Sequence, residues 1–415
     1  MAATPHEEQP VNQYAAAVAV ALFGSSTVMA QRDPLMHTVA LRLSASEGDF
    51  IAFRRDLHQH PEASGNEART AERVAARLRA LGLEVRTGVG GHGVVAVLRG
   101  GRPGPVVAYR ADMDAVMTDD ADPVAFRSLT PGVRHICGHD LHTSIGLALA
   151  TSLHAVRAQL AGTVLFIFQP AEERATGALA MLGAGVFGIW SPDAIYALHT
   201  APLEVGQVGT IAGDLMSGRD AYRITLSGAG DLAAAARTVT ERLDAMATIT
   251  PEQSFAPAPR DLILIESRAE ADSAGSRTIQ GTIMATALSR PRVVEAIAEL
   301  RAMSLPNVTV RVDYRPKLMA GVTNDSALTP RAVAALRREL GGAATLEVNQ
   351  IIPAFSEDFG AFTEQVPGTY FFLGVSNSAN GTVGMPHTPG YVADEGAIQI
   401  GARAMAAVIL DRLRR

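Results

Sequence analysis

The stretch that decides the fold is TVLFIFQPAEERATGALAMLGAGVFGIWSPDAIYALHT, residues 163–200. Its pattern predicts an apolar strand at 163–168, a helix at 176–185 and a second apolar strand at 194–198. Two more predicted strands come before it, GVVAVL (93–98) and PVVAYR (105–110). Strands that alternate with helices are typical of an α/β fold, in which a mostly parallel sheet is flanked by helices.

A different pattern begins near residue 217. It predicts four strands and two helices in the order strand 222–227, helix 231–247, strand 262–267, strand 278–286, helix 290–302 and strand 308–314. These elements would form a separate α+β domain with a four-stranded antiparallel sheet. We therefore expect a catalytic domain in two parts, 46–216 and 324–415. A second domain is inserted between them at 217–323, hereafter the inserted domain.

Composition excludes several classes of protein. The chain has 415 residues, of which 47% are hydrophobic, so it can bury a large core and is not globally disordered. Its net charge of −6 argues against nucleic-acid binding, which needs a basic surface. Cys137 is the only cysteine, which excludes an intrachain disulfide framework and fits a reducing compartment.

The N-terminal segment 1–45 is expected to be an extension or a signal. Its apolar run AAAVAVALF (15–23) is too short to span a bilayer, so no stable membrane insertion is expected. A signal peptide should begin with positive charge, whereas this chain begins with an acidic HEEQ segment. We expect a cytoplasmic protein, with export by a weak N-terminal signal as the alternative.

Residue types that bind metals gather in four places. They are Asp112 and Asp114, then His135, Cys137, His139, Asp140 and His142, then Glu172 and Glu173, and finally His199. Three of these four places directly follow a predicted strand. Because ligands bind outside the carboxyl ends of strands in α/β sheets, these side chains are expected at one edge of the sheet.

Thiolate, imidazole and carboxylate ligands together suit Zn²⁺, Mn²⁺, Co²⁺ or Ni²⁺. Two such ions can polarise a carbonyl and activate a water, provided that a carboxylate which is not a ligand takes the proton of the water. Adjacent acids after a strand point in different directions and can divide these tasks. Glu173 would bind metal, and Glu172 would act as the general base.

Seven motifs resemble those of the M20 metallopeptidase family, in its aminoacylase and hippurate-hydrolase branch of N-acyl-amino-acid amidohydrolases. They are RRDLHQHPEASGNEARTA (54–71), YRADMDA (109–115), HICGHDLHTS (135–144), FQPAEE (168–173), ALHTAPLEVGQVG (197–209), SEDFGAF (356–362) and MPHTPGYVADEGAI (385–398). Together they cover about 50–216 and 324–412, so the resemblance concerns the catalytic domain.

The resemblance implies a role for each matching position. It assigns two divalent metal ions to five ligands, Cys137, His139, Glu173, His199 and His387. Glu172 matches the general base, and Asp112 matches a residue that supports the metal centre. Spacing alone does not indicate His387. The resemblance further implies cleavage of the amide bond of an N-acyl amino acid or a related small amide, and a homodimer formed through the inserted domain.

The inserted domain departs from the family pattern. LSGAGDLAAAARTV (226–239) lacks the usual histidine, with Asp231 near its place. ADSAGSRTIQGTIM (271–284) lacks the usual asparagine, and Met284 stands where an arginine is expected. In the family, the missing histidine and asparagine would help to bind the substrate carbonyl or carboxylate. The lost cation could be replaced by one of four arginines, Arg219, Arg223, Arg268 or Arg277.

Two alternatives stay open at this point. Cys137 could be a nucleophile activated by a histidine, although this would leave the two glutamates and His387 without a task. The altered inserted domain also allows an M20-like protein that has lost hydrolysis. Such a protein would be a non-hydrolytic biosynthetic enzyme or a ligand-binding protein.

Overall fold

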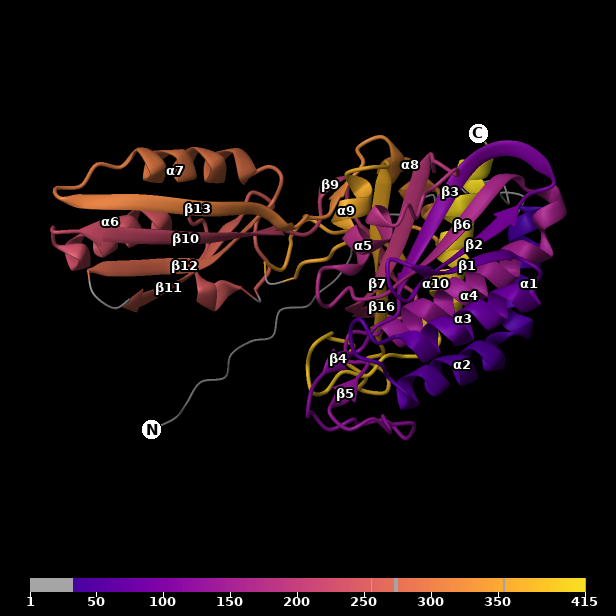
Figure 1. Cartoon of the computed structure of the whole chain (residues 1–415). Helices are drawn as coiled ribbons and strands as arrows, with labels where there is room; N and C mark the ends of the chain where they lie inside the picture. Colours follow the sequence, from indigo (N-terminus) through magenta and orange to yellow (C-terminus); the bar gives the residue numbers. More distant parts are fainter. Residues whose placement is uncertain (1–32, 255, 272–274, 354, 415) are drawn as a thin grey trace, which may run out of the picture. The chain divides into compact units, whose positions relative to one another are not determined.

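A computed structural model describes residues 33–254, 256–271, 275–353 and 355–414 (Figure 1). The apolar run 15–23 therefore lies outside the described residues. Within them, no helix is both long enough and apolar enough to cross a membrane.

The larger sheet has eight strands. In spatial order they are β1 (Glu84–Val89), β2 (Gly93–Arg99), β6 (Ala161–Gln169), β3 (Arg102–Asp112), β7 (Ala194–Glu204), β16 (Gly368–Ser376), β8 (Val208–Thr210) and β15 (Thr345–Glu347). The central strands β6, β3, β7 and β16 are parallel to one another. The predicted fold class is thus confirmed, and the predicted strands that flank the metal-binding motifs form the middle of this sheet.

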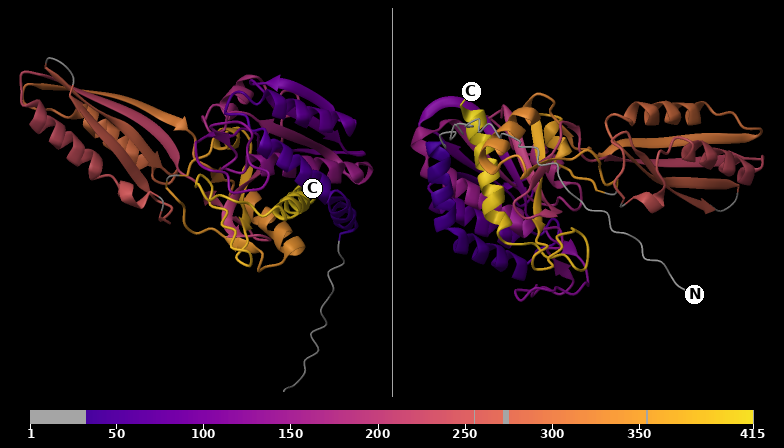
Figure 2. Two further views of the ribbon diagram at one scale, coloured as in Figure 1. Left: turned by 90° about the horizontal axis from the view of Figure 1, so that it is seen from below. Right: turned by 180° about the vertical axis from the view of Figure 1, so that it is seen from behind.

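Helices cover both faces of the larger sheet (Figures 1 and 2). One face packs against α1 (Pro34–Ala45), α2 (Glu47–Gln59), α3 (Ala68–Ala80), α4 (His139–Ala155), α8 (Leu328–Leu340) and α10 (Ala397–Leu413). The other face packs against α5 (Gly177–Gly183) and α9 (Gly360–Thr363). Side chains of β2 alternate between the two cores, since Val94 faces the first and Val95 the second. Burial on both faces explains why these strands are continuous apolar runs.

Helix α1 lies in the segment that was expected to be an N-terminal extension. Its side chains Met36, Val39 and Leu43 are buried in the same core as α4 and α10. The packed part of the chain therefore begins at Pro34, twelve residues before the expected boundary at residue 46. Met36, Val39 and Leu43 recur at helical spacing, but this segment was assigned to the extension and no helix was predicted there.

The second sheet contains four antiparallel strands, as predicted. Their order is β11 (Ile263–Ala271), β12 (Ser276–Ala285), β10 (Gly218–Gly228) and β13 (Val308–Met319). Helices α6 (Leu232–Asp244) and α7 (Arg290–Ala302) cover one face of this sheet, where Ile224, Ile279 and Ile283 are fully buried (Figure 2). The opposite face carries polar side chains such as Arg223 and Gln280, and at one end it carries the buried Leu264 and Met284.

Short elements complete the fold. They are the strand pairs β4 (Val116–Met117) with β5 (Val133–Arg134) and β9 (Gly213–Asp214) with β14 (Thr323–Asn324), and the 3₁₀ helices η1 (Arg157–Gln159) and η2 (Pro251–Gln253). The pair β9–β14 joins the two points at which the chain enters and leaves the second sheet.

Candidate metal centre

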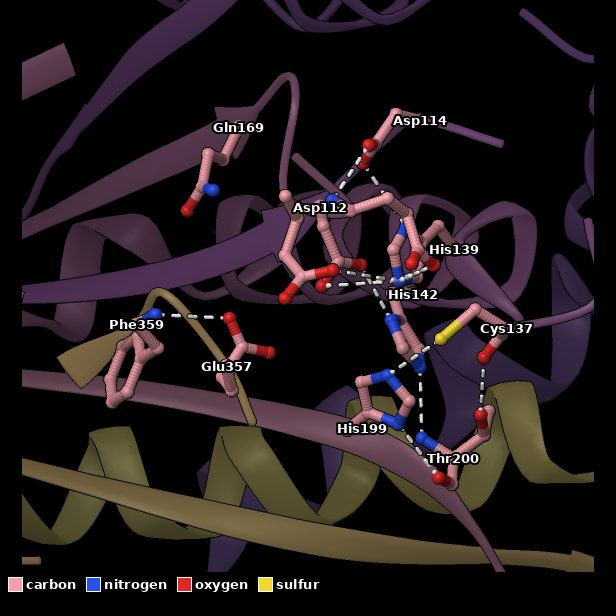
Figure 3. A network of polar contacts seen from close by, with 12 residues as sticks. Asp112, Asp114, Cys137, His139, His142, Gln169, His199, Thr200, Glu357 and Phe359 are labelled. Atoms are coloured by element: carbon pink, nitrogen blue, oxygen red, sulfur yellow. Dashed lines mark hydrogen bonds and ion pairs between the residues drawn. The ribbon is translucent and has the colours of Figure 1, made fainter. Parts of the chain in front are cut away.

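The candidate site lies at the carboxyl ends of the central parallel strands (Figure 3). Asp112 is the last residue of β3, Glu172 and Glu173 follow β6, and His199 is the middle residue of the long strand β7. Because β6, β3 and β7 are adjacent and parallel, their ends meet at one edge of the sheet. The edge predicted from the spacing of the motifs is the edge at which these residues lie.

Cys137 and His139 are held at this edge by the start of α4. Gly138 between them adopts a left-handed conformation with φ of 93°. A Cβ atom at this position would lie 2.3 Å from the Tyr391 hydroxyl and 2.8 Å from Thr200 Oγ1. Only glycine therefore allows the chain to turn here and place both neighbouring side chains toward the site.

His387 reaches the site from the loop between β16 and α10. Its backbone N–H donates to the carbonyl oxygen of Ile136 at 2.9 Å, which joins this loop to the residue before Cys137. His387 itself has φ of 58°, an uncommon conformation for a residue other than glycine. This backbone contact explains how a residue 250 positions along the chain meets the Cys137 thiol.

The five predicted ligands converge in two groups that share one sulfur atom. Cys137 Sγ lies 3.1 Å from His199 Nε2 and 3.2 Å from His387 Nε2. His387 Nε2 is also 3.4 Å from Glu173 Oε1. The ligand atoms of each group lie within 4.8 Å of one another, and the groups are Cys137, His139 and His199, and Cys137, Glu173 and His387. This arrangement offers two adjacent metal positions with the thiol between them.

Hydrogen bonds orient the imidazoles so that one nitrogen of each stays available. His139 Nδ1 donates to Asp114 Oδ1 at 3.2 Å, and His199 Nδ1 donates to the Thr200 carbonyl oxygen at 2.7 Å. His139 Nε2 and Glu173 Oε1 are buried without a hydrogen-bond partner among the described residues. Buried polar atoms are normally paired, and metal-binding histidines characteristically donate their second N–H to a carboxylate or a carbonyl. The donor set therefore fits metal ions.

The pKa shifts of the clustered side chains are also consistent with a site for metal ions. Burial and the neighbouring Glu357 and Glu173 raise the pKa of Glu172 well above its usual range. Burial and both glutamates, 173 and 172, likewise raise the pKa of the Cys137 thiol. Burial alone would lower the pKa of His139, but nearby Asp112 and Asp114 raise it to about 10. Beyond burial, neighbouring carboxylates contribute to all three shifts, and divalent cations would balance this negative charge.

Asp112 stands behind the two groups and is not a member of either. It is fully buried, its Oδ2 accepts from Arg110 at 2.6 Å, and its Oδ1 accepts from His142 Nδ1 at 2.6 Å. Its Oδ2 also lies 3.7 Å from His139 Nε2. His142 has no free nitrogen, because its Nε2 accepts from the Thr200 N–H at 2.9 Å. Both residues hold neighbouring side chains in position.

Sequence reasoning assigned no role to Glu357, although the motif SEDFGAF that contains it was noted. Glu357 accepts hydrogen bonds from Arg110 at 2.8 Å and from the Tyr370 hydroxyl at 2.5 Å. Its carboxylate lies within 4.8 Å of that of Glu172. Arg110 could have indicated this role, because it is a charged residue at the end of an apolar strand. A guanidinium buried there requires acidic partners, and Glu357 is one of them.

A cavity of about 330 Å³ opens onto the site. Four of the five predicted ligands line it together with Glu172, and His139 lies behind them. Its remaining walls are largely apolar, formed by Ala201, Met216, Met319, Phe355, Phe372 and Pro386. The size and lining are typical of a site for a small organic molecule.

The positions that depart from the family pattern have distinct places. Asp231 caps α6, since its carboxylate accepts from the N–H groups of residues 233 and 234. Of the four arginines that could replace the lost cation, Arg219 lines the cavity. Arg223 and Arg268 lie on the polar face of the second sheet. Arg277 stands opposite Leu226, near the far end of β10.

Comparisons with known proteins agree with this geometry. The model of peptidase family M20/M25/M40 matches residues 108–411. The chain is 31% identical to N-acetylcysteine deacetylase of Bacillus subtilis, over 88% of this chain and 98% of that protein. It is 30% identical to thermostable carboxypeptidase 1 of Saccharolobus solfataricus, over 86% and 93%.

A solved structure is similar throughout its length. The YXEP protein of Bacillus subtilis, described as a dinuclear metal binding peptidase from the M20 family, superimposes with a TM-score of 0.76 at 28% identity. The match covers 89% of this chain and 99% of that one. The 11% of this chain outside the match is shorter than the segment 217–323, so the match includes at least part of the inserted domain.

Proposed function

Since this chain belongs to peptidase family M20/M25/M40, we propose that it is a metal-dependent amidohydrolase that cleaves the amide bond of an N-acyl amino acid or a related small amide. One observation carries the proposal. Two groups of metal-binding atoms share Cys137 Sγ at the base of a cavity that Glu172 also lines. Two relatives named as a deacetylase and a carboxypeptidase, activities that break an amide bond, support the reaction type.

Two divalent ions, Zn²⁺, Mn²⁺, Co²⁺ or Ni²⁺, would be held by Cys137, His139, Glu173, His199 and His387. When bound, such ions polarise the amide carbonyl and lower the pKa of a water. The dinuclear site described for the YXEP protein supports this assignment. Cys137 then serves as a ligand rather than a nucleophile, because its Sγ belongs to both donor groups, beside His199 and His387, and a nucleophilic cysteine would leave His387 without a task.

Glu172 would move the proton. Its raised pKa favours the protonated form, so the carboxylate readily accepts a proton from the attacking water. The same group then donates that proton to the nitrogen of the leaving amine. Glu357, held by Arg110 and Tyr370, lies close enough to keep this pKa high.

Asp112 would support the reaction without contacting the substrate. It is absent from the residues that line the cavity, and it is buried between Arg110 and His142. Its negative charge stabilises the orientation of His142, which in turn receives the Thr200 N–H next to His199. We assign it a positioning role.

The experiment replaces Glu172 by Gln in the metal-loaded protein. We expect unchanged metal content and a loss of turnover of about 10²–10⁴-fold, the usual contribution of a general base. Glu295→Gln, at an exposed position on α7, is the matched control and should retain full activity. Wild-type activity in Glu172→Gln would exclude the proposed base. Bound metal without turnover of any N-acyl amino acid by the wild type would favour the ligand-binding or biosynthetic alternative.

Residues 217–323 are proposed to act as the lid and as the surface of a homodimer. Support comes from the separate sheet and its own buried core. Sedimentation of the metal-loaded protein would test the dimer, and a monomer at all concentrations would contradict it. A cytoplasmic location stays a prediction, which cell fractionation would test.

A further inference from the structure

Arg219 is the one permanently charged basic residue among the described residues that line the cavity. It lies near the start of β10, at the point where the chain leaves the larger sheet and enters the second. The other basic groups in the cavity, His199 and His387, belong to the predicted metal ligands. A guanidinium in this place is therefore free to serve the substrate.

The neighbours of Arg219 in the sheet leave its charge unbalanced. In the register of β10 with β12, Arg219 stands directly opposite Met284, and in the register with β13 it stands opposite Met319. Directly opposed residues place their side chains on the same face of a sheet. Arg219 thus lies between two methionines, and Met319 lines the cavity with it.

No acidic partner compensates for this setting. The Arg219 side chain is partly buried and makes neither a hydrogen bond nor an ion pair with any described residue. Its Nε atom is buried and unpaired. Leaving such a donor unpaired costs free energy, so an arginine in this state is poised for an anionic ligand. By contrast, the neighbouring buried Asp220 pairs with Arg290 at 2.6 Å and so does not balance the charge of Arg219.

We propose that Arg219 binds the free carboxylate of the substrate and so makes the enzyme specific for amides that carry a carboxylate beside the scissile bond. The inference rests on the proposed function, because the amide must lie at the metal centre while the carboxylate meets Arg219. Guanidinium and carboxylate groups pair through two parallel hydrogen bonds, which fixes the direction of the substrate as well as its charge.

The remaining walls of the cavity define the other part of the substrate. Met216, Met319, Phe355 and Phe372 offer an apolar surface next to Arg219. This surface suits an aliphatic or aromatic side chain, or an apolar acyl group. The substrate class is therefore an N-acylated amino acid with an apolar side chain and a free carboxylate.

The test compares two probes that differ in one group. N-acetyl-L-methionine carries the carboxylate, and N-acetyl-L-methionine amide carries a neutral carboxamide in its place. Acetate release gives kcat/KM for each probe, and calorimetry gives the affinity of the metal-loaded protein for each. The variants are Arg219→Gln and Arg219→Lys, with Arg223→Gln as the control. Arg223 lies four residues further along the same face of β10 and outside the cavity.

We expect the wild type to prefer the carboxylate, and Arg219→Gln to lose about 10- to 100-fold in kcat/KM and affinity for that probe alone. Arg219→Lys should recover part of the loss, since it keeps the charge without the paired hydrogen bonds. Arg223→Gln should behave as the wild type. Unchanged metal content and melting temperature would show that Arg219→Gln is folded.

The outcomes separate this inference from the proposed function. Turnover of both probes with equal efficiency, or the same loss for both probes in Arg219→Gln, would overturn the role of Arg219 and leave the hydrolase intact. Carboxylate binding that depends on Arg219 without any turnover would support the role of Arg219 and contradict hydrolysis. Failure of the wild type to bind either probe would overturn the inference.

Discussion

Replacing Gly138 by Ala is the substitution with the most definite expected cost. The left-handed backbone, with φ of 93°, costs an alanine about 1–2 kcal/mol. The new Cβ would also lie 2.3 Å from the Tyr391 hydroxyl, and relieving such overpacking costs a further ~1–3 kcal/mol. The free energy of unfolding should therefore fall by about 2–5 kcal/mol. Because Gly138 separates Cys137 from His139, affinity for Zn²⁺ should fall by about 10- to 100-fold.

The control is Gly82→Ala. Gly82 also has a positive φ, of 74°, but no atom lies within 4 Å of the position of an added Cβ. Gly82→Ala should lower the free energy of unfolding only by the cost of the left-handed backbone, about 1–2 kcal/mol, and should leave the affinity for Zn²⁺ unchanged. Urea denaturation and competition with a zinc chelator measure the two quantities. Equal losses of stability in both variants, together with wild-type zinc affinity in Gly138→Ala, would refute the steric argument.

Two further predictions concern buried charges. His58→Gln should reduce the free energy of unfolding mainly at acidic pH. Burial lowers the pKa of His58, but hydrogen bonds to Asp122 and Asp140 raise it above the usual value. The stabilisation by protonated His58 is therefore complete below pH ~6.5 and is lost as the pH rises through the raised pKa. Urea denaturation from pH 5.5 to 9 checks this, and a difference from the wild type that grows with pH would contradict it. Asp220→Asn should lower the free energy of unfolding by about 3–5 kcal/mol, because it leaves Arg290 without its charged partner. A loss below about 1 kcal/mol in the same assay would show that this ion pair contributes little to stability.

The central sheet and most of the site could be predicted from the sequence. Apolar runs that end in acids or histidine marked β3, β6 and β7, and the carboxyl-end rule placed Asp112, Glu172 and His199 at one edge. The short strands β8 and β15 were missed because three residues are too few for a periodic pattern.

Contacts between residues far apart in the chain could not be predicted from local sequence patterns. His387 was identified through the family resemblance alone, because its place depends on a backbone hydrogen bond to Ile136 that no local spacing reveals. Arg219 stayed one of four candidates until the strand register placed it beside the cavity. The buried group of Arg110, Glu357 and Tyr370 likewise joins β3 to a part of the chain 247 residues further on.

Metal stoichiometry tests the central claim most directly. Mass spectrometric metal analysis should find two Zn²⁺ ions per chain in the zinc-loaded wild type, one for each donor group. His387→Ala removes a ligand from the group of Cys137, Glu173 and His387 only, so it should retain one ion. A wild type that binds no zinc, or a His387→Ala variant that holds two ions with unchanged affinity, would contradict the convergence of these side chains around a pair of cations.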